Sequence, residues 1–519
     1  MNMLDRLPFF WLKHPALFHS ISLILGAYAF FHSFALVLIP SLFFWTPFCI
    51  NLFYHPSIRP LFALNLLLFI LIYFFLAVSY EFPHLPDKGL IGKAHLSIDS
   101  LDKQRSPFGT QWNFHCTLLD FFPDSSPHHS IAKQIKCIVS IPQSGFLQRP
   151  LAQREYIVHG KLSKPGKGDY RLKISKLEPW LGLKENWGFT EHRFQWKKKT
   201  AEWIRKQFNN SITGFFLAGL ATGEMNVSWV KEEFSRFGLQ HLLAISGFHF
   251  AMLAGLLSFL LRLLFPRKIQ AILLLVFLAI YFTFLGFNAS VVRAWIMSSL
   301  VILSDIFEKQ STPLNNLGIA IIGILFIDPS LLNTVGFQLS FFITASILLG
   351  HQPASRWLDR WISKRRLNQV IEMDGWNQHG YLILTLFKQV LALTIAVNLV
   401  ALPMTLYLFQ QFPVIGLFYN LFFPFLVSIS LVLLFLGAFL SFIPLIGKGI
   451  VFLNDIYTGF VLKLTYQMPD FIDHYIETEF INPYFLIGYL SLLVTLLIIN
   501  NQFYEEISEE NYEAKWLFF

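Results

Sequence analysis

The sequence predicts a polytopic α-helical membrane protein, with about twelve membrane segments and one small all-β domain inserted among them. Three observations lead to this prediction. The chain of 519 residues is 54% hydrophobic and only 14% charged, whereas soluble proteins average about 25% charged residues. Several segments are apolar over nearly the ~20 residues that a membrane helix needs. Residues 81–195 are polar instead and alternate in the manner of β-strands.

The N-terminal region, residues 1–80, is expected to hold three membrane helices. Residues 16–54 are almost wholly apolar and are interrupted near Pro40, which suits two short helices. Residues 60–79 form a third apolar run. No small-residue cleavage site follows the first apolar stretch, so we expect no cleavable signal peptide.

Residues 81–195 are predicted to form a small β domain. Short alternating runs such as KAHLSIDSL, NFHCTLLDFF and EYIVHGKL are separated by turn signals such as PDSSP and KPGKGD, a pattern that indicates about five strands. A partly open five-stranded barrel of the OB type fits that number. The excess positive charge of the chain, +8, lies entirely in residues 81–200, because the remainder is neutral.

Two of the three cysteines, Cys116 and Cys137, lie in this β block. If the block is extracytoplasmic, the two could form a disulfide, because oxidising compartments favour such bonds. Two unpaired thiols are the alternative. Cys49 lies in an apolar run and is expected to be inert.

Residues 196–239 are expected to form amphipathic interfacial helices, because WKKKTAEWIRKQF and WVKEEFSRFGL interleave charges with aromatic residues. The region 240–500 should then hold the remaining membrane segments, and residues 501–519 a short tail. The expected segments are 240–264, 269–287, 291–307, 314–327, 330–349, 382–402, 424–443, 449–468 and 484–500.

The loop charges predict the orientation, because Lys and Arg in short loops favour the cytoplasm. Arg6 and Lys13 place the N-terminus inside, and the third helix then delivers the β domain to the outside. Downstream, the basic loop 351–381 falls inside, the acidic loop 469–480 falls outside, and the tail falls inside.

The stretch HLLAISGFH at residues 241–249 places polar groups inside an apolar segment. Such groups are costly in a bilayer and usually face a cavity or a partner. Ser246 could act as a nucleophile with His249 as its base, or His241 and His249 could bind a metal. The segment could also line a polar path, with Gly247 permitting a bend, or its polar groups could simply satisfy the backbone and the helix ends. The residues alone leave these four interpretations open.

Further polar residues recur at membrane depth downstream. They are Arg293, Gln338, Ser340, Thr344, Asn398 and Asn420, with Pro403, Pro413 and Pro424 beside the last two. Broken helices that carry Pro and Asn are typical of segments lining a cavity, although Asn and Gln also hold helices together. Taken together, these residues predict a polar interior.

In order and spacing, the sequence motifs resemble those of the ComEC family, the competence proteins that carry transforming DNA across the inner membrane. The motifs are HLLAISGFH (241–249), SVVRA (290–294), DPSLLNTVGFQLSF (328–341) and Asn–Pro elements at 398–403 and 420–424. The resemblance covers roughly residues 20–500. It implies an extracytoplasmic OB-like domain followed by a core in the inner, or cytoplasmic, membrane that forms the channel for single-stranded DNA.

The resemblance implies pore-lining or packing roles, and no catalytic role, for the motif residues. These residues are His241, Ser246, Gly247, His249, Arg293, Gly336, Gln338, Ser340, Asn398, Pro403 and Asn420. We therefore expect HLLAISGFH to be a helix start or break beside the translocation path.

Many members of the ComEC family also carry a C-terminal metallo-β-lactamase-like domain, proposed to degrade the strand that is not transported. Its His-x-His-x-Asp-His motif has no match here, and the adjacent His128 and His129 have the wrong spacing. The chain also stops soon after its last apolar segment. We therefore expect no enzymatic activity, no metal and no cofactor, and a nuclease could act as a separate protein.

A basic β domain outside the membrane could gather a polyanion, and OB-type grooves bind single strands through basic residues and aromatic rings that stack on bases. The candidates are Lys161, Lys164, Lys167, Arg171 and Lys173, with Tyr156 and Tyr170 nearby. An ordinary solvated surface is the alternative. The expected partners are single-stranded DNA, membrane lipid and cytoplasmic proteins that pull or bind the strand, and a homo-oligomer could enclose the path.

Two other function classes fit parts of the sequence. A transporter or exporter of a small or lipid-linked substrate would share the polar, broken helices, but a basic, strand-rich outer domain favours DNA. An intramembrane serine hydrolase would use Ser246 and His249, but no third orienting group is visible.

Overall fold

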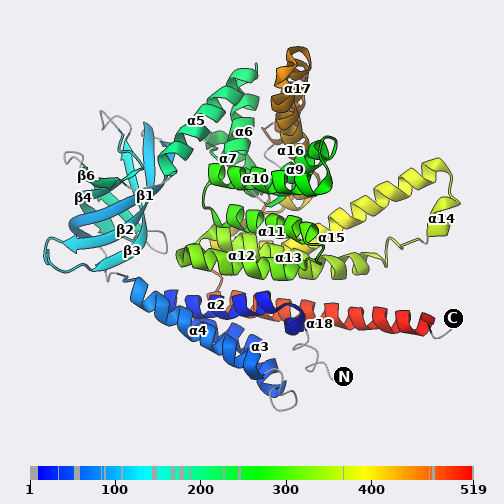
Figure 1. Ribbon diagram of the computed structural model, residues 1–519, viewed down its shortest axis with the longest axis horizontal. Coiled ribbons are helices and arrows are strands. Elements are labelled where there is room, and N and C mark those ends of the chain that lie inside the picture. The colour runs from blue at the N-terminus through cyan, green and yellow to red at the C-terminus, as the bar shows by residue number, and fades with distance from the viewer. Residues whose placement is uncertain are drawn as a thin grey trace.

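The computed structural model combines a helical part with a β domain at its side (Figure 1). It describes residues 10–32, 34–51, 59–82, 85–86, 89–106, 109–142, 149–164, 170–174, 180–185, 189–225, 228–243, 247–365, 367–466, 468–469 and 474–516.

Three N-terminal helices are present where the apolar runs predicted them. They are α2 (Pro15–Phe31), α3 (Phe34–Asn51) and α4 (Arg59–Ser79). The buried Asn65 of α4 joins it to α2, since its side-chain oxygen accepts a hydrogen bond from Ser22 Oγ at 2.8 Å. An amide of this kind holds two apolar helices together without exposing a polar group to lipid.

The β domain is a small barrel. Its strands are β1 (Leu90–Ser106), β2 (Gly109–Pro123), β3 (Ala132–Pro142), β4 (Arg154–Ser163), β5 (Tyr170–Ile174) and β6 (Leu181–Glu185). Their order is β1-β2-β3-β5-β4-β6, and β1 also pairs with β4, so the first five strands close on themselves. Strands β3 and β5 run parallel, and the other pairings are antiparallel.

Alternation of side chains explains why this polar block folds as a barrel. In β4, Tyr156, Val158 and Leu162 are buried while Lys161 between them is exposed. The inward side chains of the five strands form one apolar cluster that includes the fully buried Phe114. A small sheet is stable only when it buries one face in this way.

The structure has Cys116 and Cys137 as free thiols, so it does not contain the disulfide that was considered from the sequence. The two residues do face each other across the β2–β3 register. They are only 1% and 2% exposed, and they pack in the barrel core as small apolar side chains. Burial raises the pKa of Cys137 to about 12 and also raises that of Cys116, which makes both thiols unreactive.

We expect neither buried cysteine to react with a thiol-specific reagent in the folded protein, because the thiolate is the reactive form and burial disfavours it. Both should react fully after denaturation without a reductant, as measured by mass spectrometry of the labelled protein. If labelling of Cys116 and Cys137 required prior reduction, the pair would be a disulfide in the cell.

Three helices connect the barrel to the core: α5 (Thr190–Gln207), α6 (Ser211–Thr222) and α7 (Ser228–Arg236). Helices α5 and α7 carry the charged and aromatic residues that predicted interfacial helices. Helix α6 differs from that expectation, because it is apolar and buried along most of its length. It packs with α16 and α17 in one hydrophobic cluster.

Beyond α7, the regular structure of the described residues is helical, with one short strand pair. The helices are α8 (Gln240–Leu243), α9 (Gly247–Arg262), α10 (Arg267–Leu285), α11 (Ala289–Ile306), α12 (Pro313–Ile327), η3 (Pro329–Asn333), α13 (Val335–Leu358), α14 (Leu367–Ile371), α15 (Gly375–Phe409), α16 (Ile415–Phe439), η4 (Leu440–Phe442), α17 (Pro444–Tyr466) and α18 (Pro483–Trp516). The strands β7 (Gln411–Pro413) and β8 (Tyr475–Glu477) pair with each other.

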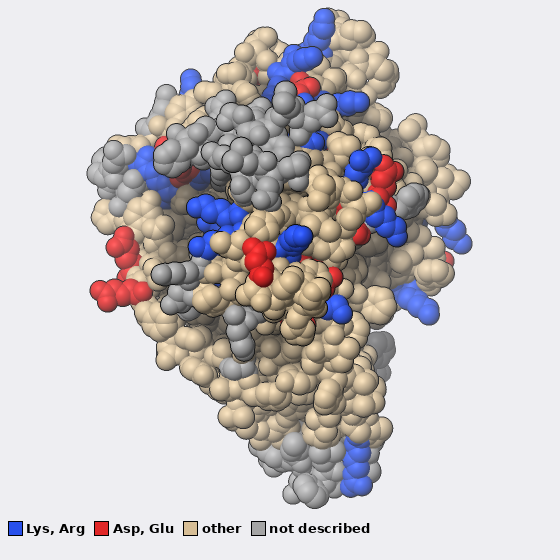
Figure 2. Space-filling view, turned by 90° about the vertical axis from the view of Figure 1, so that its left-hand side faces the viewer, with Lys and Arg blue, Asp and Glu red and all other residues tan. Residues whose placement is uncertain are grey.

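Seven helices in the described part of the chain are long and apolar enough to cross a membrane: α4, α10, α11, α15, α16 with η4, α17 and the apolar part of α18 up to Phe503. Five shorter apolar helices accompany them. Figure 2 views the molecule from the side of the β domain, and its lower part, where Figure 1 places α3 and α4, shows few charged side chains. The chain is therefore a multi-pass membrane protein with a β domain, as its composition predicted.

Candidate functional site

The most distinctive polar contact in the helical core is made by Arg293, near the start of α11. Its Nη1 donates a hydrogen bond to the backbone oxygen of Ser340 in α13, at 2.7 Å. The same oxygen accepts a hydrogen bond from Thr344 Oγ1 at 2.7 Å. The guanidinium carbon also lies 5.9 Å from the centre of the Phe341 ring. Arg293 therefore joins the first turns of two neighbouring helices.

Gly247, the first residue of α9, leaves the space that the Arg293 side chain occupies. A Cβ atom on Gly247 would lie 2.8 Å from Arg293 Nη2 and 3.8 Å from the Cβ of Ala294. Atoms do not approach a real Cβ as closely as 2.8 Å, so a side chain here would displace the guanidinium. Gly247, Arg293 and Ser340 come from three separate sequence motifs, and we call these three residues the Arg293 cluster.

The Arg293 cluster is electropositive and incompletely paired. Arg293 Nε and Ser340 Oγ are buried atoms without a hydrogen-bond partner among the described residues. The ion pairs between described residues do not include Arg293. Helices α9, α11 and α13 all begin nearby, and helix N-termini carry partial positive charge. A half-buried cation in this setting favours an anionic ligand.

Two further motif residues tie α13 to its neighbours. The carbonyl of Gly336 accepts a hydrogen bond from Ser290 Oγ of α11, at 3.4 Å. Gln338 Nε2 donates to the hydroxyl of Tyr28 in α2, at 3.2 Å. These contacts are packing contacts, and they fix the position of the helix that supplies Ser340.

The remaining motif residues are not brought to Arg293 by any contact seen in the structure. Asn398 Nδ2 donates to the carbonyl of Thr394 in its own helix, at 2.9 Å, and Pro403 lies inside the same helix, α15. Asn420, in α16, has a buried side-chain oxygen without a partner among the described residues. Their helices nevertheless pack against those of the Arg293 cluster, α15 against α13 and α16 against α9.

The HLLAISGFH stretch leads from α8 (Gln240–Leu243) into α9 (Gly247–Arg262). Residues 244–246 between the two helices lie outside the described residues, so the predicted helix start or break there stays a prediction. Ser246 lies outside the described residues, so its proposed role as a nucleophile stays a hypothesis. His249 is buried, at 5% exposure, whereas His241 is exposed.

On the β domain, the basic candidates lie on the outer face of β4 and β5. Lys161 and Lys173 are cross-strand partners, and Arg171 is the partner of Ser163. All three basic side chains are exposed. Lys164 is exposed and its ammonium lies 4.9 Å from the centre of the Tyr170 ring. Lys167, between the two strands, lies outside the described residues.

Tyr156 and Tyr170, the two candidate rings for base stacking, are buried in the structure. Their exposures are only 6% and 7%, because strand alternation turns both rings into the barrel core. The hydroxyl of Tyr156 also donates to the backbone oxygen of Leu151, at 3.1 Å.

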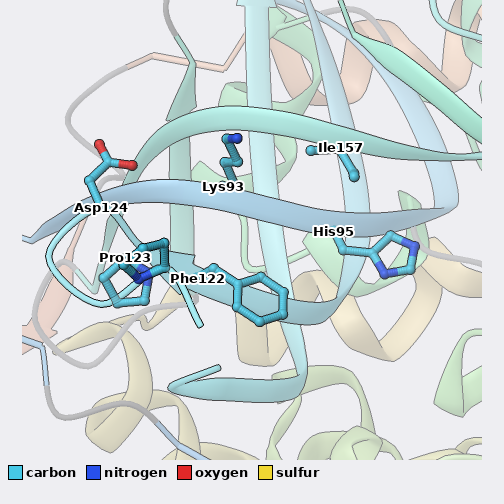
Figure 3. A pocket seen from close by; sticks show the side chains of 7 residues that line it. Lys93, His95, Phe122, Pro123, Asp124 and Ile157 are labelled. Atoms are coloured by element: carbon cyan, nitrogen blue, oxygen red, sulfur yellow. The ribbon is translucent and has the colours of Figure 1, made fainter. Parts of the chain in front are cut away.

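A pocket on another part of the barrel supplies the aromatic surface that the two tyrosines do not (Figure 3). It has a volume of about 340 Å³ and is lined by Lys93, His95, Phe122, Pro123, Asp124, Pro127 and Ile157. Phe122 and Lys93 are cross-strand partners on β2 and β1, and both side chains reach the surface. Sequence reasoning missed this pocket, although the alternation in GKAHL and LDFFP could have placed Lys93, His95 and Phe122 on the outer face.

Comparison with known proteins identifies the family. A family model described as Competence protein matches residues 222–502, more than half of the chain. This chain belongs to the competence protein family. The match includes α8 to α17 and the whole Arg293 cluster, so the resemblance stated from the sequence motifs is confirmed. Together with the seven long apolar helices, it makes the chain a multi-pass protein of the inner membrane.

Two curated relatives are similar over part of the chain. "ComE operon protein 3" of Bacillus subtilis (strain 168) is 31% identical over 193 residues, which are 37% of this chain and 22% of that protein. "Uncharacterized protein MG316 homolog" of Mycoplasma pneumoniae is 27% identical over 169 residues, 31% of this chain and 44% of that protein. The matched segments thus cover less than half of either relative. No solved structure matches the chain.

Two glycine substitutions should show whether Gly247 is needed because it leaves space for Arg293, or whether any glycine in these motifs has the same effect when it is replaced. Gly247→Ala places a methyl group against the end of the Arg293 side chain, so the guanidinium must shift and its hydrogen bond to Ser340 should weaken, at a cost of up to about 1.5 kcal/mol. Gly336→Ala is the matched control, since a Cβ there meets no atom within 4 Å. In thermal unfolding of the purified protein, we expect a lower midpoint for Gly247→Ala and an unchanged one for Gly336→Ala. Equal effects would show that Arg293 does not need the space at Gly247.

Proposed function

We propose that this chain carries single-stranded DNA across the inner membrane during natural competence, along a path that passes the Arg293 cluster. The observation that supports this proposal most is the pairing state of Arg293. It lies in the region that matches the competence protein family, and part of its guanidinium has no partner among the described residues. A strand with one phosphate per nucleotide supplies the anion that such a group favours.

The contacts between loops support a topology of twelve membrane segments with the β domain outside. Each predicted apolar segment corresponds to a helix: α2, α3, α4, α9, α10, α11, α12, α13, α15, α16, α17 and α18. If each helix crosses once and the N-terminus lies inside, α9, α11 and α13 all begin at the outer surface. The same alternation puts β7 and β8 on the outer side, in agreement with their pairing.

The β domain is proposed to be an OB-like domain that receives the strand outside the membrane. A closed barrel of five strands supports this assignment, because OB domains are five-stranded barrels that bind single-stranded nucleic acids. The pocket beside Phe122 is large enough for one nucleotide unit by the usual size of small-ligand sites. Its aromatic ring offers a stacking surface and Lys93 offers a charge for a phosphate.

The chain is proposed to act by binding and passage, without catalysing a reaction. Gly247 of HLLAISGFH leaves room for the Arg293 side chain. This packing role for the motif requires no nucleophile. Proteins that pull the strand on the cytoplasmic side, and a separate nuclease, are then the expected partners.

A charge variant in the core tests the proposed path. Arg293→Met should reduce DNA internalisation by about ten- to a hundredfold, since a hydrogen bond to a charged group contributes about 1.5–3 kcal/mol. DNA bound at the cell surface should stay at the wild-type amount. The measurement is fluorescent DNA uptake in a deletion strain that expresses each variant.

Arg267→Met is the matched control for Arg293. It removes a second helix-end arginine, which is exposed and paired with Asp305, and uptake should persist. The proposed function would be wrong if the deletion strain internalised DNA normally. A normal Arg293→Met variant in a strain that depends on the protein would exclude the Arg293 cluster from the path.

The outer pocket can be tested on the purified protein. Phe122→Ala should weaken binding of a short oligothymidylate by about 1–3 kcal/mol, the usual loss for one stacked base. Lys93→Met should lower the salt dependence of binding by about one phosphate contact. Arg154→Met is the control. Arg154 lies in β4 and is paired with Glu185, so its loss should leave base stacking in the pocket unchanged. Unchanged affinity in both pocket variants would exclude this pocket from DNA binding.

A further inference from the structure

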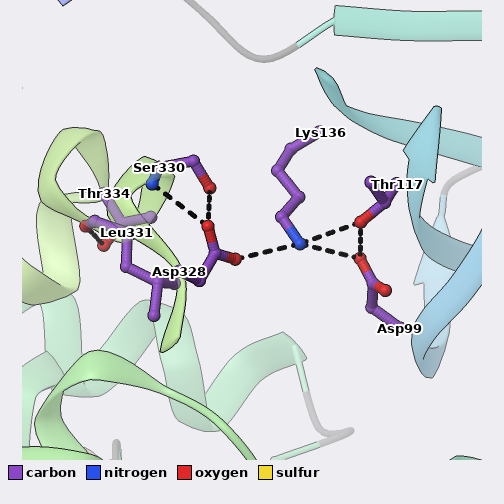
Figure 4. A network of polar contacts seen from close by, with 7 residues as sticks. All are labelled: Asp99, Thr117, Lys136, Asp328, Ser330, Leu331 and Thr334. Carbon is purple, nitrogen blue, oxygen red and sulfur yellow. Dashed lines mark hydrogen bonds and ion pairs between the residues drawn. The ribbon is translucent and has the colours of Figure 1, made fainter. Parts of the chain in front are cut away.

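One ammonium group, that of Lys136, joins the β domain to the membrane core (Figure 4). Lys136 Nζ lies 3.0 Å from Asp99 Oδ2 of β1 and 2.9 Å from Thr117 Oγ1 of β2. It also lies 3.0 Å from Asp328 Oδ2, between α12 and η3. A lysine has three donor hydrogens, and here each has one acceptor, two in the barrel and one in the core.

Asp328 is itself held in place at the start of η3. Its Oδ1 accepts hydrogen bonds from the backbone N–H of Ser330 at 3.1 Å and from Ser330 Oγ at 2.5 Å. The other carboxylate oxygen therefore points to Lys136 from a fixed turn, as Figure 4 shows. This turn runs directly into α13, whose first residue is Val335 and which supplies Ser340 to Arg293.

Two other contacts accompany the Lys136–Asp328 pair. The backbone groups of Glu81 and Lys133 exchange hydrogen bonds of 3.3 and 3.0 Å, which ties β3 to the chain that leaves α4. Arg193 Nε of α5 donates to the backbone oxygen of Thr283 in α10, at 2.9 Å. The barrel therefore contacts the ends of several core helices. Its contact with the turn before η3 is the ion pair between the side chains of Lys136 and Asp328.

The same turn also contacts the end of the first N-terminal helix. His32, directly after α2, has its Nε2 3.0 Å from Asn333 Oδ1 of η3. The turn that Asp328 begins therefore contacts both the barrel and α2.

We propose that Lys136 and Asp328 are positioning residues, which hold the β domain against the turn that leads into α13 and its Ser340–Arg293 contact. This inference deepens the proposed function, on which its transport readout rests. Lys136 is 42% exposed and Asp328 21% exposed, and ion pairs of that exposure are weak. Loss of the pair should therefore shift the barrel on the core and leave each part folded.

The test compares three variants of the full-length protein. Lys136→Met removes the charge and keeps the aliphatic stem, and Lys136→Arg keeps a charged donor. Lys133→Met is the matched control, because Lys133 is an exposed lysine on the same strand. Hydrogen exchange of the purified proteins without DNA reports docking, oligothymidylate binding reports the barrel surface, and fluorescent DNA uptake in the deletion strain reports transport.

For Lys136→Met, we expect about two- to fivefold faster exchange of the η3 amides, as for the loss of an exposed ion pair, and a comparable loss of internalisation. Oligothymidylate binding should stay within twofold of wild type. Lys136→Arg should restore at least half of the uptake, and Lys133→Met should match wild type in all three measurements. A loss of internalisation with unchanged oligothymidylate binding is the result that a merely structural role would not give.

Unchanged exchange of the η3 amides in Lys136→Met would overturn the docking role of the pair. Faster exchange with normal internalisation would overturn its positioning role. A parallel loss of binding and transport would also overturn it, because the variant would then have damaged the barrel. A failure of the proposed function would give a different result, because the deletion strain would then take up DNA normally. The hydrogen-exchange measurement contains no DNA, so it tests the docking role independently of the proposed function.

Discussion

The absence of water in a bilayer core is the constraint on which the structure depends. Every polar group at that depth must find a partner inside the protein or face an aqueous space. Among the described residues, Asn398 meets the constraint with a carbonyl of its own helix. Arg293 meets it only in part, because its Nη1 bonds to the Ser340 carbonyl while its buried Nε has no partner there. The incomplete pairing is informative, because an unsatisfied charged group is costly at this depth.

The Arg293 cluster also gives the glycine of the 241–249 motif a structural role. Gly247 leaves room for a guanidinium group, and Ser340 contributes its backbone oxygen, which a residue of another type would also supply. At both positions the backbone and the space around it matter more than side-chain chemistry. The three helix starts that meet there add positive partial charge, so a region of low polarity can still favour an anion.

The β domain and the core share one segment, the turn from Asp328 through η3 into α13. On one side this turn contacts Lys136 of the barrel, and on the other it leads to the helix that holds Arg293. The DPSLLN sequence (328–333) is therefore the place where the barrel meets the helix that supplies Ser340 to Arg293.

The sequence by itself determined the membrane class, the long apolar helices and the strand-rich block, because these follow from local hydropathy and alternation. The motifs at 241–249, 290–294 and 328–341 also indicated the family. The tertiary structure decided which polar residues meet. It joined Arg293 to Ser340 and Gly247, sent Gln338 toward Tyr28 instead, and turned Tyr156 into the barrel core.

Those outcomes depend on helix rotation and strand register, which no local pattern records. The Lys136–Asp328 pair joins residues almost two hundred positions apart, and hydropathy carries no information about such a pairing. The same limit applies to Cys116 and Cys137. Their alternation predicted that both lie in strands, whereas their state as buried free thiols follows from the packing around them.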